Sequence, residues 1–74
     1  MNGFPESLKA CRQLRQWSQE KAAVQCGISY GTFRRYETGR REPSLSILCA
    51  MADGFGVTLD QLAGRAPLPE EPQS

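Results

Sequence analysis

A stretch near the middle of the chain, SYGTFRRYETGRREP at residues 29–43, holds four of the nine basic residues of this 74-residue protein. Aromatic residues stand between its arginines, and Gly31 falls where a helix is expected to run. Guanidinium groups donate hydrogen bonds to phosphate oxygens and to the acceptor atoms of base edges. The stretch therefore has the residue types of a nucleic-acid contact, although a solvated helix face has the same composition.

Helical phasing divides this stretch into two sets. At about 100° per residue, a helix that turns Phe33 inward also turns Tyr36 and Glu37 inward, which assigns these three to the fold. The remaining side chains are predicted to contact base edges, and they are Tyr30, Gly31, Thr32, Arg34 and Arg35. Two alternatives stay open, because Arg34 suits phosphate as well as base contact, and Tyr30 suits partial burial against the preceding helix.

Gly31 and Arg35 form a specific pair on the outward side. Helical side chains lean toward the N-terminus, so Arg35 is expected to sweep over position 31, where a bare glycine leaves it room. Glycine inside a helix costs about 1 kcal/mol relative to alanine, and its presence needs an explanation. Close approach to DNA is one explanation, and drift is the other.

The elements that must position this face are predicted to be helices. Apolar residues recur at helical spacing, and serine, threonine, glycine and proline stand at the expected boundaries. We expect a first helix at residues 5–17, with Leu8, Cys11 and Leu14 facing inward, a second between the N-cap Ser18 and Gly27, and a third between the N-cap Ser29 and Gly39. A fourth helix is expected at residues 45–55, after Pro43 and Ser44, and its inward residues are expected to be Leu45, Leu48, Cys49, Ala52 and Phe55. A short fifth helix is expected at residues 59–63, after Thr58. These segments predict an all-α, compact five-helix bundle over residues 1–64, and residues 65–74, rich in proline and glutamate, are expected to form a disordered tail.

Charge is distributed unevenly along the chain. The formal net charge is only +1, yet residues 9–41 carry eight basic against two acidic side chains, a net charge of +6. Residues 42–74 carry one basic against five acidic side chains, a net charge of −4. Such polarity places a basic face on a nearly neutral molecule, which attracts phosphates locally while the acidic half limits indiscriminate binding.

Other classes of function find little support in the composition. Histidine is absent and the three cysteines, Cys11, Cys26 and Cys49, form no CxxC pair, so we expect no metal and no cofactor. We interpret the cysteines as small buried apolar residues. The sequence has no glycine-rich phosphate loop and no paired carboxylates that suggest an enzyme. No apolar run approaches the roughly 18 residues that span a bilayer, and no secretory signal begins the sequence, so we expect a cytoplasmic protein without a membrane partner.

Several separate positions resemble the phage repressor and Cro-type helix-turn-helix family of DNA-binding proteins. They follow the family's order across residues 8–62, and they are Ser18, Gln19, Ala23, Gly27 and Ser29, the YETG of residues 36–39, Pro43, Ser44 and the GVTLDQL of residues 56–62. The resemblance implies a lambda-repressor-like domain whose second and third helices form the helix-turn-helix, with the third in the major groove. Departures from the family pattern occur at Cys11, Trp17, Ala22 and Cys26, and we expect the large Trp17 ring to fill the space that smaller side chains leave.

The resemblance also bears on residues outside the outward face. Contacts to phosphate are expected from Ser18 and Gln19 and, along the same surface, from Thr38, Arg40 and Arg41, although the two arginines also suit an ordinary basic loop. By resemblance, Arg12 and Glu37 form an internal ion pair. By resemblance too, Phe55, Val57 and Leu59 form a dimer interface, with membership of the monomer core as the alternative.

Together these observations predict a sequence-specific regulator of transcription, a repressor that binds a double-stranded DNA operator as a homodimer and joins the nucleoid when bound. The alternative from another class is an antitoxin or other protein-interaction module, with a toxin as its main partner. Its support is limited to the acidic, proline-rich tail.

Overall fold

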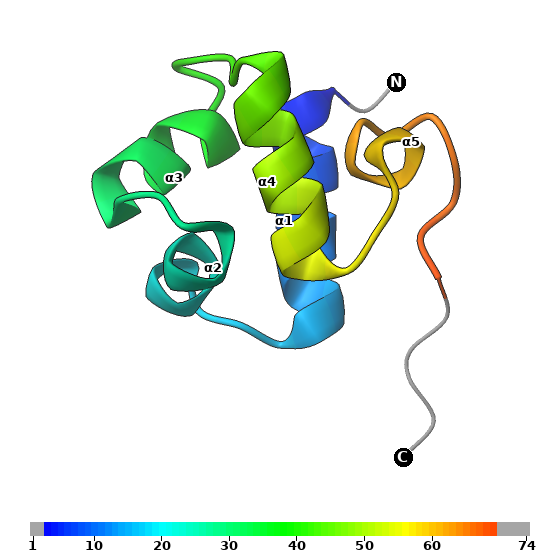
Figure 1. Cartoon of the computed structure of the whole chain (residues 1–74), viewed down its shortest axis with the longest axis horizontal. Helices are drawn as coiled ribbons and strands as arrows, with labels where there is room; N and C mark the ends of the chain where they lie inside the picture. The colour runs from blue at the N-terminus through cyan, green and yellow to red at the C-terminus, as the bar shows by residue number, and fades with distance from the viewer. Residues whose placement is uncertain (1–2, 70–74) are drawn as a thin grey trace.

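The computed structural model describes residues 3–69 and contains five α-helices in that range. They are α1 (Phe4–Arg15), α2 (Gln19–Cys26), α3 (Tyr30–Glu37), α4 (Leu45–Phe55) and α5 (Leu59–Leu62). In Figure 1, α2 and α3 lie to one side of α1 and α4, and α5 lies to the other. α4 packs against α1, α2 and α5, while α3 packs against α1 and α2, so the expected all-α bundle is confirmed. None of the helices in the described range is long and apolar enough to cross a membrane.

Hydroxyl side chains begin the last four helices, as the sequence predicted. Ser18, Ser29, Ser44 and Thr58 each accept a hydrogen bond from the backbone N–H three residues ahead, at 3.0, 3.1, 3.3 and 3.0 Å. Each bond satisfies an N–H that has no partner within its helix and stabilises the helix by about 1 kcal/mol. Between α2 and α3, Gly27 adopts the left-handed conformation at φ 74°, which makes the tight turn that joins the two helices.

The end of α1 differs from the prediction. The helix ends at Arg15 instead of continuing to residue 17, because Gln16 turns into the left-handed region at φ 60°. The Trp17 N–H then donates to the carbonyl oxygen of Arg12 at 3.2 Å, which closes the helix. This break releases Trp17 to pack against the core, where its ring stacks on Phe55 with centroids 5.5 Å apart.

The inward stripe of α4 also differs from the prediction, although the bounds of the helix are as expected. Leu45 is 69% exposed and Cys49 is exposed, whereas Met51 is fully buried. The inward positions are therefore Leu48, Met51, Ala52 and Phe55, with spacings of three and four residues that define one helix face. Leu45 has nearly the same helical phase as Ala52 but lies in the first turn of α4, where its side chain is exposed.

α4 approaches α2 closely at Gly54. An ideal Cβ at Gly54 would lie 2.5 Å from the carbonyl oxygen of Gln25 and 3.1 Å from the Cα of Cys26. Side chains cannot fit between two backbones at this distance, so the glycine sets how near the helix-turn-helix lies to the central helix.

The segment after α5 makes specific contacts. Leu68 packs against the core, and the Gln61 Nε2 donates to the carbonyl oxygen of Pro67 at 3.1 Å. The expectation of a disordered tail at residues 65–74 falls partly outside the described residues, which end at residue 69.

Candidate nucleic-acid interface

The outward face of α3 is built from residues at helical spacing. Phe33 and Tyr36 are buried, at 0% and 4% exposure, and anchor the helix to the core. The exposed residues lie one turn apart on the other side, and they are Tyr30, Gly31, Arg34, Arg35 and Thr38. The division of this stretch into an inner and an outer set is therefore confirmed, except that Thr32 is half-buried at the edge of the exposed set.

A shallow groove of about 440 Å³ follows this face. Its lining consists of Gly31, Arg34, Arg35, Thr38 and Arg40. Three arginines thus line the groove together with a glycine that has no side chain, which concentrates positive charge where an acceptor group can enter. Arg40, from the turn after α3, lies with the helix residues, whereas Arg41 is exposed elsewhere in the same turn.

Gly31 is not required by the fold. An ideal Cβ at this position would meet no atom of the described residues within 4 Å, and its φ lies outside the left-handed range. Alanine is the better helix former by about 1 kcal/mol, so packing and backbone geometry leave the glycine without a structural reason. The space above it is open to a ligand.

Tyr30 and Arg34 contact each other on the exposed surface. The Arg34 Cζ lies 5.6 Å from the centroid of the Tyr30 ring, a distance typical of a cation–π contact. Tyr30 is 42% exposed, so its ring is presented on the face and not buried against α2. The ring holds the guanidinium of Arg34 in one region of the surface.

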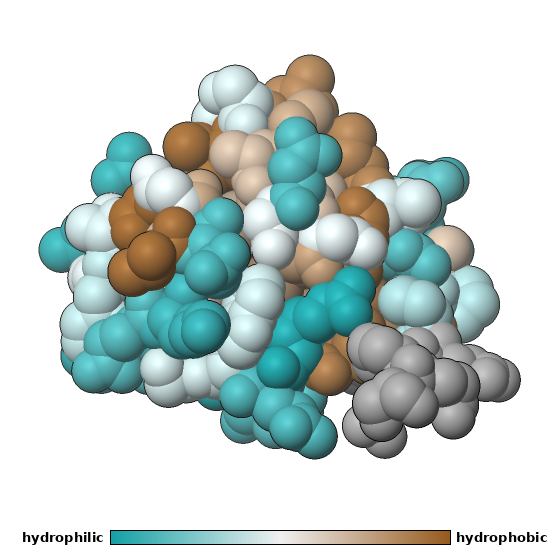
Figure 2. Space-filling model, turned by 60° about the horizontal axis from the view of Figure 1, so that its bottom comes forward, coloured by the Kyte–Doolittle hydropathy of each residue, from teal (hydrophilic) through white to brown (hydrophobic). Residues whose placement is uncertain are grey.

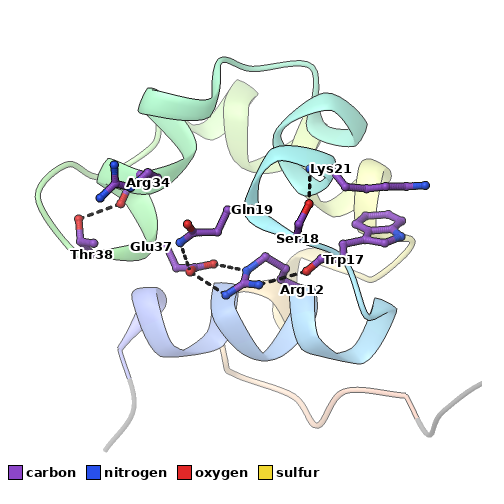
Figure 3. A network of polar contacts seen from close by, with 8 residues as sticks. All are labelled: Arg12, Trp17, Ser18, Gln19, Lys21, Arg34, Glu37 and Thr38. Atoms are coloured by element: carbon purple, nitrogen blue, oxygen red, sulfur yellow. Dashed lines mark hydrogen bonds and ion pairs between the residues drawn. The ribbon is translucent and has the colours of Figure 1, made fainter.

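An internal polar network removes the acidic group of α3 from this face. Glu37 Oε2 accepts from Arg12 Nε at 2.8 Å, and Glu37 Oε1 accepts from Arg12 Nη2 at 3.0 Å and from Gln19 Nε2 at 2.7 Å. Figure 3 shows the Glu37 side chain pointing from α3 toward α1, away from Arg34 and Thr38. The expected ion pair is present, and Glu37 is only 6% exposed. As a result, the outward face of α3 carries positive charge alone.

Three of the residues expected to contact phosphate, Ser18, Gln19 and Thr38, are held by other bonds. Ser18 caps α2, and the Gln19 amide is bound to Glu37, which fixes both at the start of that helix. Thr38 Oγ1 donates to the carbonyl oxygen of Arg34 at 2.8 Å. Thr32, which was expected to contact a base edge, accepts from Ser29 Oγ through its Oγ1 at 2.8 Å. These bonds hold the side chains in place around the two ends of α3.

The three residues expected at a dimer interface lie in different environments. Phe55 is 1% exposed and contacts Trp17 and Phe33, so it belongs to the monomer core and that part of the prediction is wrong. Val57 is half-buried against the core, and Leu59 is 41% exposed. Figure 2 shows hydrophobic side chains at the surface of the molecule in separate groups among hydrophilic ones.

Two of the three cysteines are buried and one is exposed. Burial raises the pKa of the Cys11 and Cys26 thiols from 9.0 to about 11, because the thiolate form loses its solvation. The positive charge of Arg15 lowers the pKa of Cys11, whereas the neighbouring Cys11 raises the pKa of Cys26. Cys49 is exposed on α4, so the expectation that all three are buried is wrong for this residue. Among residues 3–69, no three cysteine, aspartate or glutamate side chains form a group that could hold a metal.

Arg15 has a structural role that its residue type does not predict. Arg15 Nε donates to the carbonyl oxygen of Phe55 at 2.7 Å, and its Nη2 donates to that of Gly56 at 3.3 Å. The last carbonyls of α4 lack partners within the helix and carry partial negative charge, so this cation stabilises the helix end. Residue type alone does not separate Arg15 from the arginines of α3, because the contact joins residues 40 positions apart.

Comparison with known proteins relates this geometry to a family. A family model described as a helix-turn-helix domain matches residues 6–64. The chain belongs to this helix-turn-helix family. Helix-turn-helix transcription regulators are a DNA-binding class and not a class of enzymes, which agrees with the sequence analysis.

Curated relatives of this helix-turn-helix chain are named as transcription regulators. The HTH-type transcriptional regulator AnsR of Bacillus subtilis (strain 168) is 40% identical over 60 residues, which cover 81% of this chain and 52% of the relative. The cryptic phage CTXphi transcriptional repressor RstR of Vibrio cholerae is 32% identical over 60 residues, which cover 81% of this chain and 54% of the relative. The chain thus spans about half the length of these relatives.

A solved structure has the same fold. The hypothetical transcription factor NHTF from Neisseria matches with a TM-score of 0.77 and 32% identity, over 81% of this chain and 69% of that chain. Together with the family match, this likeness confirms the resemblance and the helix-turn-helix fold that the sequence predicted.

Proposed function

We propose that this helix-turn-helix chain is a sequence-specific regulator of transcription that inserts α3 into the major groove of a double-stranded DNA operator. The observation that carries the proposal is the charge arrangement on α3. Arg34 and Arg35 face outward beside the bare Gly31, while Glu37, the only acid of the helix, is bound inside by Arg12. A purely basic helix face with an open floor suits the acceptor-rich edge of the major groove.

Phosphate contacts on both sides of α3 would orient the helix in the groove. Ser18 and Gln19 stand at the N-terminus of α2, where free backbone N–H groups and the helix dipole favour a phosphate. Thr38, Arg40 and Arg41 lie at the other end of α3. The regulator would repress transcription by occupying the operator and excluding polymerase. The name of RstR, a transcriptional repressor, supports this direction of control.

The proposal includes binding as a homodimer. One α3 of eight residues reaches few base pairs, and helix-turn-helix domains gain selectivity by binding two half-sites about one helical turn apart. The exposed Leu59, with Val57 beside it at the base of α5, supplies the apolar surface for the contact. Leu59→Arg is expected to abolish two-to-one binding to a two-half-site duplex in sedimentation, whereas Leu45→Arg, at an exposed leucine of α4, should leave the stoichiometry unchanged.

The proposed recognition of DNA by α3 is tested by substituting its two outward arginines. A duplex is first selected by the wild-type chain from a random pool, and affinities are then measured by fluorescence anisotropy. Replacing both Arg34 and Arg35 by alanine removes two contacts worth about 1–3 kcal/mol each, so affinity should fall by at least about 30-fold. Arg65→Ala is the matched control, because Arg65 is exposed beside Asp60 at 3.6 Å, away from α3. Full affinity of the double variant would dismiss the mechanism.

A further inference from the structure

We infer that the operator of this protein is read through guanines, with Arg34 and Arg35 of each protomer directed at guanine bases in the major groove. This inference rests on the proposed function and deepens it by naming the bases that α3 selects. It depends on which hydrogen-bonding groups the exposed face of α3 has to offer.

Side chains that pair with adenine or cytosine are missing from this face. Adenine is recognised in the major groove by asparagine or glutamine, and the cytosine amino group by a carboxylate. Residues 29–41 contain no asparagine, glutamine or aspartate, and their only glutamate is Glu37. Because Glu37 accepts hydrogen bonds from Arg12 and Gln19 inside the fold, no carboxylate of α3 is presented to a base edge.

The serine and threonine hydroxyl groups of residues 29–38 are engaged in local bonds. Ser29 Oγ caps α3 and donates to Thr32 Oγ1, while Thr38 Oγ1 donates to the carbonyl oxygen of Arg34. Their bonds stabilise the two ends of the helix. Selective contact therefore falls to the side chains between these ends.

The guanidinium groups of three arginines are free to donate hydrogen bonds to a base. Arg12 and Arg15 bind groups of the fold, whereas the guanidinium groups of Arg34, Arg35 and Arg40 donate no hydrogen bond to any residue within 3–69. Guanine is the base that offers two adjacent acceptors, N7 and O6, to such a fork. Adenine places an amino donor beside N7, which opposes a second donor from arginine.

The surroundings of Arg34 and Arg35 favour contacts to bases over contacts to phosphates. Arg35 lines the groove with Gly31, whose missing side chain lets a base edge approach the helix. The Tyr30 ring, 5.6 Å from the Arg34 Cζ, restricts the orientation of that guanidinium and lowers the entropy lost on pairing. Arg40 lies in the turn beyond the helix, where the DNA backbone is expected.

The test begins with selection of bound duplexes from a random pool, which should enrich guanine at two positions of each half-site. Each selected guanine is then replaced by 7-deazaguanine, which lacks N7 but keeps Watson–Crick pairing. Affinity should fall by about fivefold or more at each position. Inosine is the matched control, because it keeps N7 and O6 and lacks only the minor-groove amino group; affinity should stay within about twofold if the major groove is read.

Single variants assign each guanine to its arginine. With Arg35→Ala, 7-deazaguanine should have no further effect at one position and keep its effect at the other, and Arg34→Ala should show the reverse pattern. Thermal midpoints within a few degrees of wild type show that both variants fold. Selected sites without guanine, or 7-deazaguanine without effect, overturn the inference while DNA binding stands. Failure to bind any duplex overturns both the inference and the proposed function.

Discussion

Two glycines inside helices, Gly31 and Gly54, are predicted to respond in opposite ways to the same substitution. An added Cβ at Gly31 enters open space, whereas at Gly54 it would lie 2.5 Å from the carbonyl oxygen of Gln25. Gly31→Ala therefore gains the helix propensity of alanine, about 1 kcal/mol, without a steric cost. In a domain of this size that gain raises the thermal midpoint by about 4–8 °C.

Gly54→Ala should lower the midpoint instead. The atoms near the added Cβ are backbone atoms of Gln25 and Cys26, so α2 must move away from α4 to make room. Overpacking of this kind costs about 1–3 kcal/mol, which exceeds or cancels the gain in helix propensity. Differential scanning calorimetry of both variants against wild type measures the two shifts. A lower midpoint for Gly31→Ala would refute the conclusion that the fold leaves this position free.

Gly31 then links stability to function. If glycine is present because DNA approaches α3, a large side chain at position 31 must weaken binding while the fold survives. Gly31→Leu tests this, since leucine is a good helix former and fills the groove floor beside Arg35. Unchanged affinity for a selected duplex would leave drift as the explanation for Gly31.

Further substitutions and reagents test the core and its polar network. Glu37→Ala leaves a guanidinium half-buried without its partner and should reduce the free energy of unfolding by about 3–5 kcal/mol in urea titrations; a loss near zero would show that the network is not stabilising. Trp17→Ala removes a half-buried stacked ring and should cost less than the about 3–5 kcal/mol typical of a fully buried tryptophan, and an unchanged thermal midpoint would contradict the packing of this ring on the core. A thiol reagent at neutral pH should modify Cys49 alone in the native protein, with Cys11 and Cys26 reacting after unfolding; three equally fast thiols would argue against their burial. The free energy of unfolding should also fall as pH rises from 9.0 to about 11, because Cys11 and Cys26 ionise in the unfolded chain while the fold raises their pKa and keeps them neutral. Replacing both cysteines by alanine should flatten this decline in urea titrations at alkaline pH.

Local signals in the sequence were sufficient to predict most of the helix boundaries. Ser18, Ser29, Ser44 and Thr58 begin helices because a hydroxyl at that position satisfies a backbone N–H, whatever the tertiary context. The inner and outer faces of α3 also followed from helical phase, since large aromatic and charged residues alternate there with the period of a helix.

Predictions that depended on distant contacts were less successful. In α4 nearly every residue is apolar or small, so the sequence pattern allowed two stripes, and contact with α2 through Gly54 selected the one containing Met51. The roles of Arg15 and Gln19 each required a partner from another helix, which residue type does not reveal. The hydropathy of Phe55 is compatible with both an interface and a core, and its stacking against Trp17 places it in the core.

Contact between DNA and the outward face of α3 can be measured by adding a selected duplex to the ¹⁵N-labelled chain and following backbone amide chemical shifts. The largest changes are expected at residues 18–19, 30–38 and 40–41, with little change in α5 apart from residues near Leu59. Large changes confined to the outer surfaces of α1 and α5, with α3 unaffected, would contradict DNA contact through α3.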